Sequence, residues 1–265
     1  MSDKTPFVEL TVAGTSFLGR TLALEMNAGL AGPRTGGWID LDNRDGEVSQ
    51  AVKKGEVIQV AGGRLGNGKT ALLTGTLPKE PRQGQGSRKH AIRIDLADGW
   101  ASTDNVLVVN ALMDVTPREV MNHVLGLAGV TNTRLSAKTF PRLHHVVLDG
   151  VNLAHTARIV EEAWRLEDWR VGFDPDGLFF WESWTESPAA TATPTVFGGE
   201  DLLRLERRPG ETGVAEFFFE AGLFPGDLIE LPLDDAAQTV RIEHRRHYFD
   251  GNRFRTEVRF GPIPS

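Results

Sequence analysis

The sequence predicts a β-rich α+β protein in which two antiparallel β regions, each a barrel or a sandwich, flank a small α/β insert. Short apolar runs separated by turn residues fill the first hundred residues, helical spacing appears in the middle, and strand-like runs return after residue 200. Short strands at this spacing are typical of antiparallel barrels and sandwiches. We expect a first β region over residues 1–100, the insert over 101–187, a linker over 188–199 and a second β region over 200–265.

The first β region is predicted from short apolar runs. Strands are expected at residues 7–12, 22–26, 38–41, 56–60, 71–77 and 90–96. In the first of these runs, apolar side chains alternate with Glu9 and Thr11, as in a strand with one buried face. Residues 42–46 (DNRDG) form a cluster of turn residues, and residues 62–68 are expected to be a loop.

The middle of the chain has helix signals. Thr116 is a suitable N-cap, Pro117 suits the first helical position, and Gly129 ends the apolar helical spacing. A second helix is expected over residues 152–169, because its apolar residues recur at helical spacing. Two short apolar runs around the turn sequence DPDG at 174–177 then predict a β-hairpin.

The last third of the chain begins with a segment rich in Pro, Ala, Thr and Gly (SPAATATPTVFGG, 187–199), which predicts a linker. Strands are expected after it at residues 202–207, 215–219, 227–231, 240–247 and 253–260. The turn residues at 250–252 predict that the last two strands form a hairpin.

Composition excludes several classes of function. The 265 residues include no cysteine, which excludes disulfides, thiolate metal sites and a cysteine nucleophile. The formal net charge of −7 argues against a protein that binds nucleic acid through a basic face. The first residues contain no apolar run of signal-peptide length, and no run approaches the ~20 apolar residues that cross a bilayer. We therefore expect a soluble protein made in a cytoplasm.

Residues 63–70 (GRLGNGKT) match the phosphate-loop pattern G-x-x-x-x-G-K-[ST]. In that interpretation Lys69 would contact the terminal phosphate and Thr70 would bind magnesium, and a helix would begin at Lys69. The following residues instead contain Gly75 and Pro78 and show no amphipathic helical pattern. We therefore interpret the segment as a β-hairpin with a turn at 66–68, since Asn-Gly is a strong hairpin signal. A phosphate-loop nucleotide-binding protein is the less favoured alternative.

Other polar residues predict no catalytic, cofactor-binding or metal-binding site. His144, His145 and His155 lack carboxylate or cysteine partners at ligand spacing, so we interpret them as surface histidines. His244 and His247 are expected on opposite faces of one strand, where they cannot share an ion.

Two groups of residues allow two interpretations each. The first is an arginine group that is either a solvated strand face or a contact for an acidic partner or DNA. Its members are Arg241, Arg245, Arg246, Arg253 and Arg255. The second is a group of tryptophans that either fill the core of the insert or mark a protein contact. Its members are Trp164, Trp169, Trp181 and Trp184.

The order of the segments resembles the phage tail baseplate hub proteins, a family that includes the late-control-protein-D group, the Mu-type hubs and the N-terminal part of VgrG spikes. In the first β region the resemblance is carried by short segments in the same order. They are VELTVAG (8–14), DNRDG (42–46), KGEVIQV (54–60) and LTGTL (73–77). The last of these follows the apparent phosphate loop and supports the hairpin interpretation.

The resemblance continues to the C-terminus. It includes the helix start TPRE (116–119), the helix end LAGV (127–130), the hairpin 169–181, the segment AGLFPGDLIE (221–230) and the closing strands 240–244 and 254–260. The chain is short for such a hub and carries no lysozyme domain or repeat-rich needle, so the resemblance implies a separate spike protein.

The resemblance implies a homotrimer with two tail-tube-like antiparallel β-barrels per chain. Six barrels around one axis would join a sixfold tail tube to a threefold spike and would line the channel. The implied partners are the tail spike protein, the tail tube or distal tube protein, baseplate wedge and tape-measure proteins, and DNA only in transit. No enzyme activity, cofactor or membrane insertion is implied, and the location is the virion tail baseplate, assembled in the host cytoplasm. The alternative in the same machine is a hexameric tail-tube or tube-end adaptor.

Overall fold

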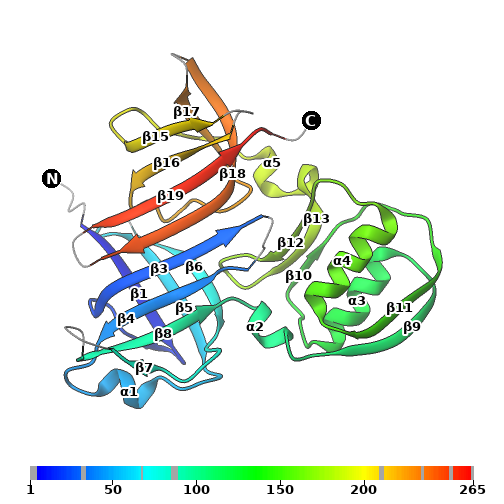
Figure 1. The fold of residues 1–265 in the computed structure, drawn as a ribbon, viewed down its shortest axis with the longest axis horizontal. Coiled ribbons are helices and arrows are strands. Elements are labelled where there is room, and N and C mark those ends of the chain that lie inside the picture. The colour runs from blue at the N-terminus through cyan, green and yellow to red at the C-terminus, as the bar shows by residue number, and fades with distance from the viewer. Residues whose placement is uncertain are drawn as a thin grey trace.

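The computed structural model describes residues 5–30, 34–66, 68–84, 89–208, 212–233, 236–250 and 253–263. It is β-rich with several antiparallel sheets, as the sequence predicts (Figure 1). The elements of the first hundred residues are β1 (Pro6–Val12), β2 (Thr15–Ser16), β3 (Thr21–Gly29), β4 (Gly36–Asp42), α1 (Glu47–Ala51), β5 (Val57–Arg64), β6 (Lys69–Thr76), β7 (Arg82–Gln83), β8 (Ala91–Ala97) and α2 (Trp100–Thr103).

The strands predicted in this part of the chain are confirmed, with one correction. The predicted loop over 62–68 is wrong at its start, because β5 continues to Arg64. Gly62 and Gly63 belong to this strand, where their missing side chains make room for neighbours. A Cβ at Gly62 would lie 2.7 Å from the Phe219 ring, and one at Gly63 would lie 2.3 Å from the Gly68 carbonyl oxygen.

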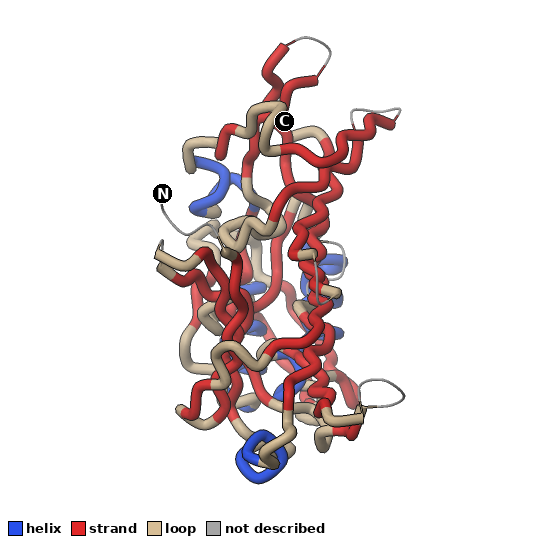
Figure 2. The backbone as a smooth tube through the Cα atoms, turned by 90° about the vertical axis from the view of Figure 1, so that its left-hand side faces the viewer, coloured by secondary structure: helices blue, strands red, loops and turns tan. Residues whose placement is uncertain are grey.

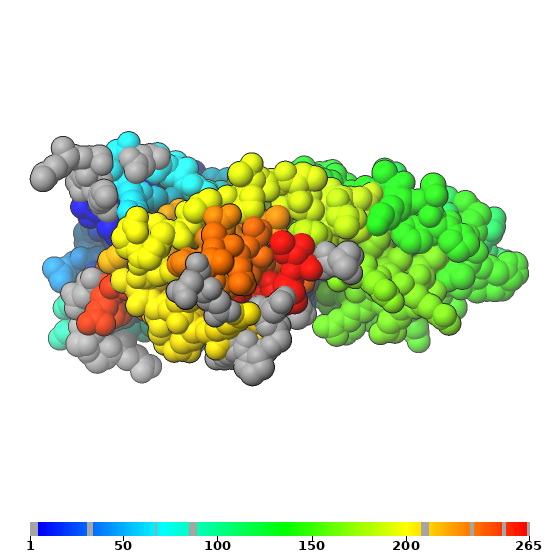
Figure 3. Space-filling view, turned by 90° about the horizontal axis from the view of Figure 1, so that it is seen from above, coloured from blue at the N-terminus to red at the C-terminus, as the bar shows by residue number. Residues whose placement is uncertain are grey.

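The middle of the chain, which we call the insert, combines helices and strands and extends to one side of the molecule (Figures 1 and 3). Its elements are β9 (Val108–Val115), α3 (Pro117–Leu127), β10 (Thr133–Leu135), β11 (Leu143–Val151), α4 (Leu153–Trp164), β12 (Trp169–Phe173), β13 (Phe179–Ser183) and the 3-10 turn η2 (Trp184–Glu186). Helix α3 begins as predicted, with a capping box in which Thr116 and Glu119 exchange hydrogen bonds. The predicted hairpin around 174–177 is β12–β13.

The second helix of the insert is shorter than predicted. We expected it to reach residue 169, but α4 ends at Trp164. Arg165 adopts a left-handed conformation (φ 52°) and its backbone N–H bonds to carbonyls of the last turn, which is a common way to end a helix. The chain then turns back, and Trp169 is the first residue of β12.

The last third of the chain contains α5 (Pro188–Thr191), β14 (Thr195–Val196), β15 (Leu202–Arg208), β16 (Thr212–Phe218), β17 (Leu228–Leu233), β18 (Ala236–Phe249) and β19 (Phe254–Gly261). The predicted strands are confirmed, and β18 and β19 form the predicted hairpin, although Gly251 and Asn252 of its turn lie outside the described residues. The expected linker contains α5 and β14, and β14 pairs with β17.

Strand pairing joins the first and last thirds of the chain. A ten-stranded sheet contains the path β15-β16-β19-β18-β3-β4-β8-β7, with β17 and β14 attached to it through β18. The joint is the antiparallel pair β3–β18, which places Met26 opposite His247. The strands of this sheet form a nearly continuous row in Figure 2, and a four-stranded sheet (β2-β1-β5-β6) lies behind it in Figure 1.

Three apolar clusters fill the interior. One lies between the ten-stranded and four-stranded sheets and contains Leu10, Met26 and Ile94. The second fills the insert, and the third lies among the strands of the last third of the chain. Within the described residues, no helix is both long enough and apolar enough to span a membrane.

Candidate functional site

The apparent phosphate loop is a β-hairpin, so the phosphate-loop interpretation of residues 63–70 is wrong. Strands β5 and β6 pair in antiparallel register with Gly63 opposite Lys69, and residues 69–76 form a strand where a phosphate loop requires a helix. Gly66 and Gly68 adopt positive φ angles of 88° and 81°, as a tight turn requires. Asn67, between them, lies outside the described residues.

The ammonium group that the phosphate-loop pattern would assign to a nucleotide binds a carboxylate of the same sheet. Lys69 Nζ lies 2.9 Å from Glu9 Oε2 on β1, and the Ser16 hydroxyl donates to the other Glu9 oxygen at 2.5 Å. These hydrogen bonds, first from Ser16 and then from Lys69, hold the pKa of Glu9 below its usual value. Lys69 therefore ties β6 to β1 across the sheet.

The three histidines interpreted as surface residues lie on the surface. His144, His145 and His155 are exposed, and the rings of the first two meet edge to face with centroids 4.3 Å apart. His247 is fully buried, and its Nδ1 lies 2.9 Å from the Thr256 hydroxyl. Among the described residues, no group of three or more His, Asp or Glu side chains is arranged to hold a metal ion.

The interpretation of the arginine group as a solvated strand face is wrong for Arg245. This side chain is fully buried at the middle of β18, and burial lowers its pKa to about 10. Its Nη1 donates to the carbonyl oxygen of Leu223 at 2.9 Å, and its guanidinium carbon lies 5.5 Å from the centre of the Phe224 ring. Arg245 therefore supports the loop that precedes β17.

That loop, residues 221–227, lies between β16 and β17 and forms hydrogen bonds with the insert. Arg170 of β12 donates to the Pro225 carbonyl at 3.1 Å, and Trp184 donates to the Gly226 carbonyl at 3.4 Å. Gly226 has φ +100°, and a Cβ there would lie 2.8 Å from the Arg170 guanidinium carbon. This contact explains why residue 226 is a glycine. On sequence alone, its segment, AGLFPGDLIE, showed only a resemblance to a family pattern.

A buried carboxylate on β13 completes this junction. Glu182 accepts two hydrogen bonds from Arg134, at 2.7 and 3.1 Å, and lies 4.0 Å from Arg170. Glu182 is 2% exposed and Arg170 is 8% exposed. Burial lowers the pKa of Arg170, and the negative charge of Glu182 opposes that effect.

The tryptophans fill the core of the insert and its junction with the loop 221–227, as the first of their two interpretations predicts. Trp181 and Trp184 are buried, and Trp164 and Trp169 are half-buried. The ring centroids of Trp169 and Trp181 lie 4.8 Å apart.

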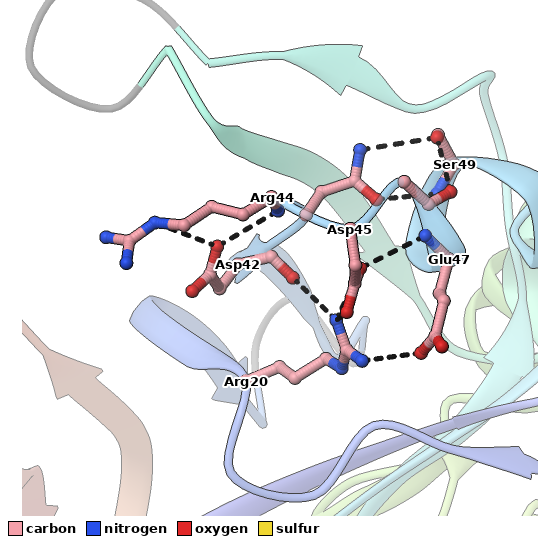
Figure 4. A network of polar contacts seen from close by, with 8 residues as sticks. Arg20, Asp42, Arg44, Asp45, Glu47 and Ser49 are labelled. Atoms are coloured by element: carbon pink, nitrogen blue, oxygen red, sulfur yellow. Dashed lines mark hydrogen bonds and ion pairs between the residues drawn. The ribbon is translucent and has the colours of Figure 1, made fainter.

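The turn at residues 42–46 is held by a polar network around Arg20 (Figure 4). Arg20 contacts Asp45 at 2.7 Å, Glu47 at 2.5 Å and the carbonyl of Asp42 at 3.4 Å. The hydrogen bond from Arg20 holds the pKa of Asp45 below its usual value. The network fixes the path of the chain from β4 into α1, so these charged residues have a structural role.

An exposed apolar face lies on the ribbon formed by β9 and β11, at the outer end of the insert (Figure 1). Val109, Met113 and Val147 are 76%, 60% and 63% exposed. Alternate residues such as Leu148 point inward to the core beneath α3 and α4. Sequence reasoning did not identify this face, because it did not predict β9.

A groove of about 610 Å³ lies where β1 and β5 meet the last third of the chain. Five phenylalanines line it, among them Phe218, which is 47% exposed, and Phe254. Its charged lining residues are Arg64, Arg255, Glu200, Asp201 and Glu220. Within the described residues, this lining includes no serine, threonine, cysteine, histidine or lysine.

Comparisons with known proteins identify the fold. No protein-family model matches the sequence, and no curated protein matches it. Among solved structures, the chain is similar to the 43 kDa tail protein of prophage MuSo2 from Shewanella oneidensis, with a TM-score of 0.68 and 9% identity over 96% of this chain and 97% of that chain. A tail protein from Neisseria meningitidis MC58 gives a TM-score of 0.67 at 10% identity over 96% of both chains.

A third similar structure is an E. coli component of the type VI secretion system, described as structurally similar to the T4 bacteriophage tail proteins gp27 and gp5. Its TM-score is 0.67 at 13% identity, over 97% of this chain and 77% of that chain. The chain therefore has the fold of these tail and secretion-system proteins.

Proposed function

We propose that this chain is the structural hub of a phage or phage-like tail baseplate. The observation that carries the proposal is the likeness of fold to two tail proteins over 96% of this chain, including the insert and both β regions. The residues of the apparent phosphate loop are used in a sheet contact, which is consistent with a structural protein that is not an enzyme. The proposed location is the virion tail baseplate, assembled in the host cytoplasm.

In the proposed assembly three copies surround one axis, and each copy contributes two tube-like β-barrels to a ring of six. The pair β3–β18 supports this arrangement, because it fixes the two β regions of one chain side by side in a continuous sheet. Head-to-tail contacts between copies close into a ring when the rotation is complete. Strand β15 is an edge strand of the ten-stranded sheet, and pairing with a strand of a neighbouring copy would cover this edge.

The proposed partners are the tail spike protein below the ring, the tail tube or distal tube protein above it, and the baseplate wedge and tape-measure proteins. DNA passes through the channel without remaining bound. The exposed apolar face of β9 and β11 is a suitable contact for one of the protein partners, because contiguous exposed apolar residues mark interaction sites.

Co-expression with the spike protein of the same tail tests the proposal. We expect the purified complex to contain three copies of this chain and three of the spike, as measured by native mass spectrometry. Six copies of this chain would instead indicate a tube or tube-end protein, and a chain that stays monomeric with the spike present would contradict a role in joining the two.

A further inference from the structure

The groove of about 610 Å³, which we call the aromatic groove, is built from segments that are far apart in the sequence. Pro6 at the start of β1 and Arg64 at the end of β5 come from the first β region. The other lining residues come from the end of β16, the start of β19 and the segment between β14 and β15. The start of β1, the end of β16 and the start of β19 lie together at the left of Figure 1. The groove therefore depends on the joint between the two β regions.

Phe218 is the aromatic side chain that the groove leaves open to solvent. It is 47% exposed at the end of β16, although its neighbours Phe217 and Phe219 are buried. Among the described residues, no other phenylalanine, tryptophan or tyrosine is exposed. The Arg255 guanidinium carbon lies 5.0 Å from the centre of the Phe218 ring and packs against one side of it. An exposed ring held in this way is typical of an interaction surface.

The lining of the groove is already packed in the free chain. The ring of Phe254 stacks on that of Phe249, with centroids 4.2 Å apart and planes at 11°. In the segment after β14, the Phe197 ring centroid lies 4.4 Å from that of Phe217. Asp201 accepts a hydrogen bond from a backbone N–H of the same segment at 3.0 Å. Binding of a partner would therefore order few side chains of this chain, which lowers the entropic cost of association.

The charges of the groove are mainly negative. The charge of Arg255 is offset by Glu216, a carboxylate outside the lining, at 3.9 Å. Arg64 donates to the Phe219 carbonyl oxygen at 3.4 Å and keeps its positive charge. Three carboxylates oppose this one charge: Glu200, Asp201 and Glu220. Among the described residues, none of the three has an ion-pair partner. The groove therefore presents an aromatic surface with an excess of negative charge.

We propose that the aromatic groove binds an extended segment of a partner protein that carries an aromatic side chain beside lysine or arginine. The aromatic ring of the partner packs against Phe218 and Phe254, and its cationic groups pair with Glu200 and Glu220. Opposite charges across an interface add specificity and speed association. The inference goes beyond the hub proposal, because it does not depend on how many copies form the ring.

A second copy of this chain fits the groove less well. Since Phe218 is the one exposed aromatic side chain among the described residues, another copy has no second exposed ring to place against it. Each copy also carries a net charge of −7, which opposes contact with an acidic surface. These two observations favour a basic segment of a different protein.

A short peptide is the probe for this contact. It contains one phenylalanine between two lysines on each side, has both ends capped and carries a fluorescent label. We expect the full wild-type chain to bind this peptide at low salt, as measured by fluorescence anisotropy, and added salt to weaken the binding. Alanine in place of the phenylalanine of the peptide should weaken binding at least about tenfold.

The variant Phe218→Ala tests the aromatic contact from the side of the groove, and we expect it to weaken peptide binding at least about tenfold. Because Phe218 is exposed, the variant should keep the thermal unfolding temperature of the wild-type chain. Leu127→Ala is the matched control, because Leu127 is 55% exposed at the end of α3 and lies outside the groove. It should change the affinity by less than about twofold.

The double variant Glu200→Gln with Glu220→Gln tests the charges and keeps the size of both side chains. We expect it to weaken binding about fivefold at low salt, because exposed ion pairs make modest contributions. The control is Glu162→Gln with Glu167→Gln, which removes the same charge from exposed positions of the insert. If basic peptides were attracted only by the net charge of the chain, both double variants would weaken binding equally.

Three results would overturn the proposal. The first is a wild-type chain that does not bind the peptide, and the second is equal weakening in the groove variants and their controls. The third is peptide binding that appears only when the oligomer is diluted to monomers, which would assign the groove to a neighbouring copy. The number of copies in the ring tests the hub proposal separately, so the two proposals can fail independently.

Discussion

Replacing Gly75 with alanine is expected to destabilise the protein by about 3 kcal/mol or more. Gly75 of β6 forms an isolated antiparallel bridge with Asp98, the residue after β8, so the four-stranded and ten-stranded sheets are in backbone contact here. A Cβ at Gly75 would lie 2.0 Å from the Ala97 carbonyl oxygen and 2.9 Å from the Asp98 Cα. Because both contacts are with backbone, no side chain can move aside, and the sheets would have to separate.

Urea denaturation of the purified variant measures this effect as a change in the free energy of unfolding. The control is Gly126→Ala near the end of α3, where no atom lies within 4 Å of the added Cβ. That substitution should stabilise by about 0.5–1 kcal/mol, because alanine has the higher helix propensity. Equal stability of the Gly75 and Gly126 variants would show that the close approach of the sheets is not tightly packed.

The variant Glu182→Gln is expected to cost about 3 kcal/mol of stability. The amide keeps the shape of the side chain but removes the negative charge, so that Arg134 and the buried Arg170 lose the carboxylate with which they form ion pairs. Arg170 also donates to the loop at Pro225. The loss should therefore loosen the contact between the insert and the last third of the chain, as well as lower the overall stability.

Hydrogen exchange of the amides in residues 221–227, measured with the unfolding free energy, separates these two effects. Glu162→Gln is the matched control, because Glu162 is exposed on α4 of the same insert and should change stability by less than about 0.5 kcal/mol. If Glu182→Gln behaved like this control, the buried ion pair would not be what holds the insert to the loop.

Local patterns predicted most strands and the start of α3, because the responsible forces act between residues close in sequence. The alternation of residues 7–12 and the cap at Thr116 are examples, and both elements form as expected. The end of α4 was missed because Arg165 supplies the left-handed cap that usually falls to glycine. The helical spacing of the apolar residues continued past this point and gave no sign of the turn.

Features that depend on distant contacts could not be predicted from local patterns. Nothing near Arg245 in the sequence indicates burial, because its burial depends on a loop about twenty residues earlier. The pair β3–β18 joins strands that are more than two hundred residues apart. The apparent phosphate loop shows the opposite case, in which a matching motif was rejected correctly because the residues after it favour a strand.

The symmetry of the purified oligomer, determined by electron cryo-microscopy, tests the central proposal most directly. The proposal predicts a threefold ring in which the two β regions of each chain alternate, so that six similar β units surround one channel. A ring with true sixfold symmetry and one chain per unit would indicate a tube or tube-end protein, and particles without a ring would contradict the hub.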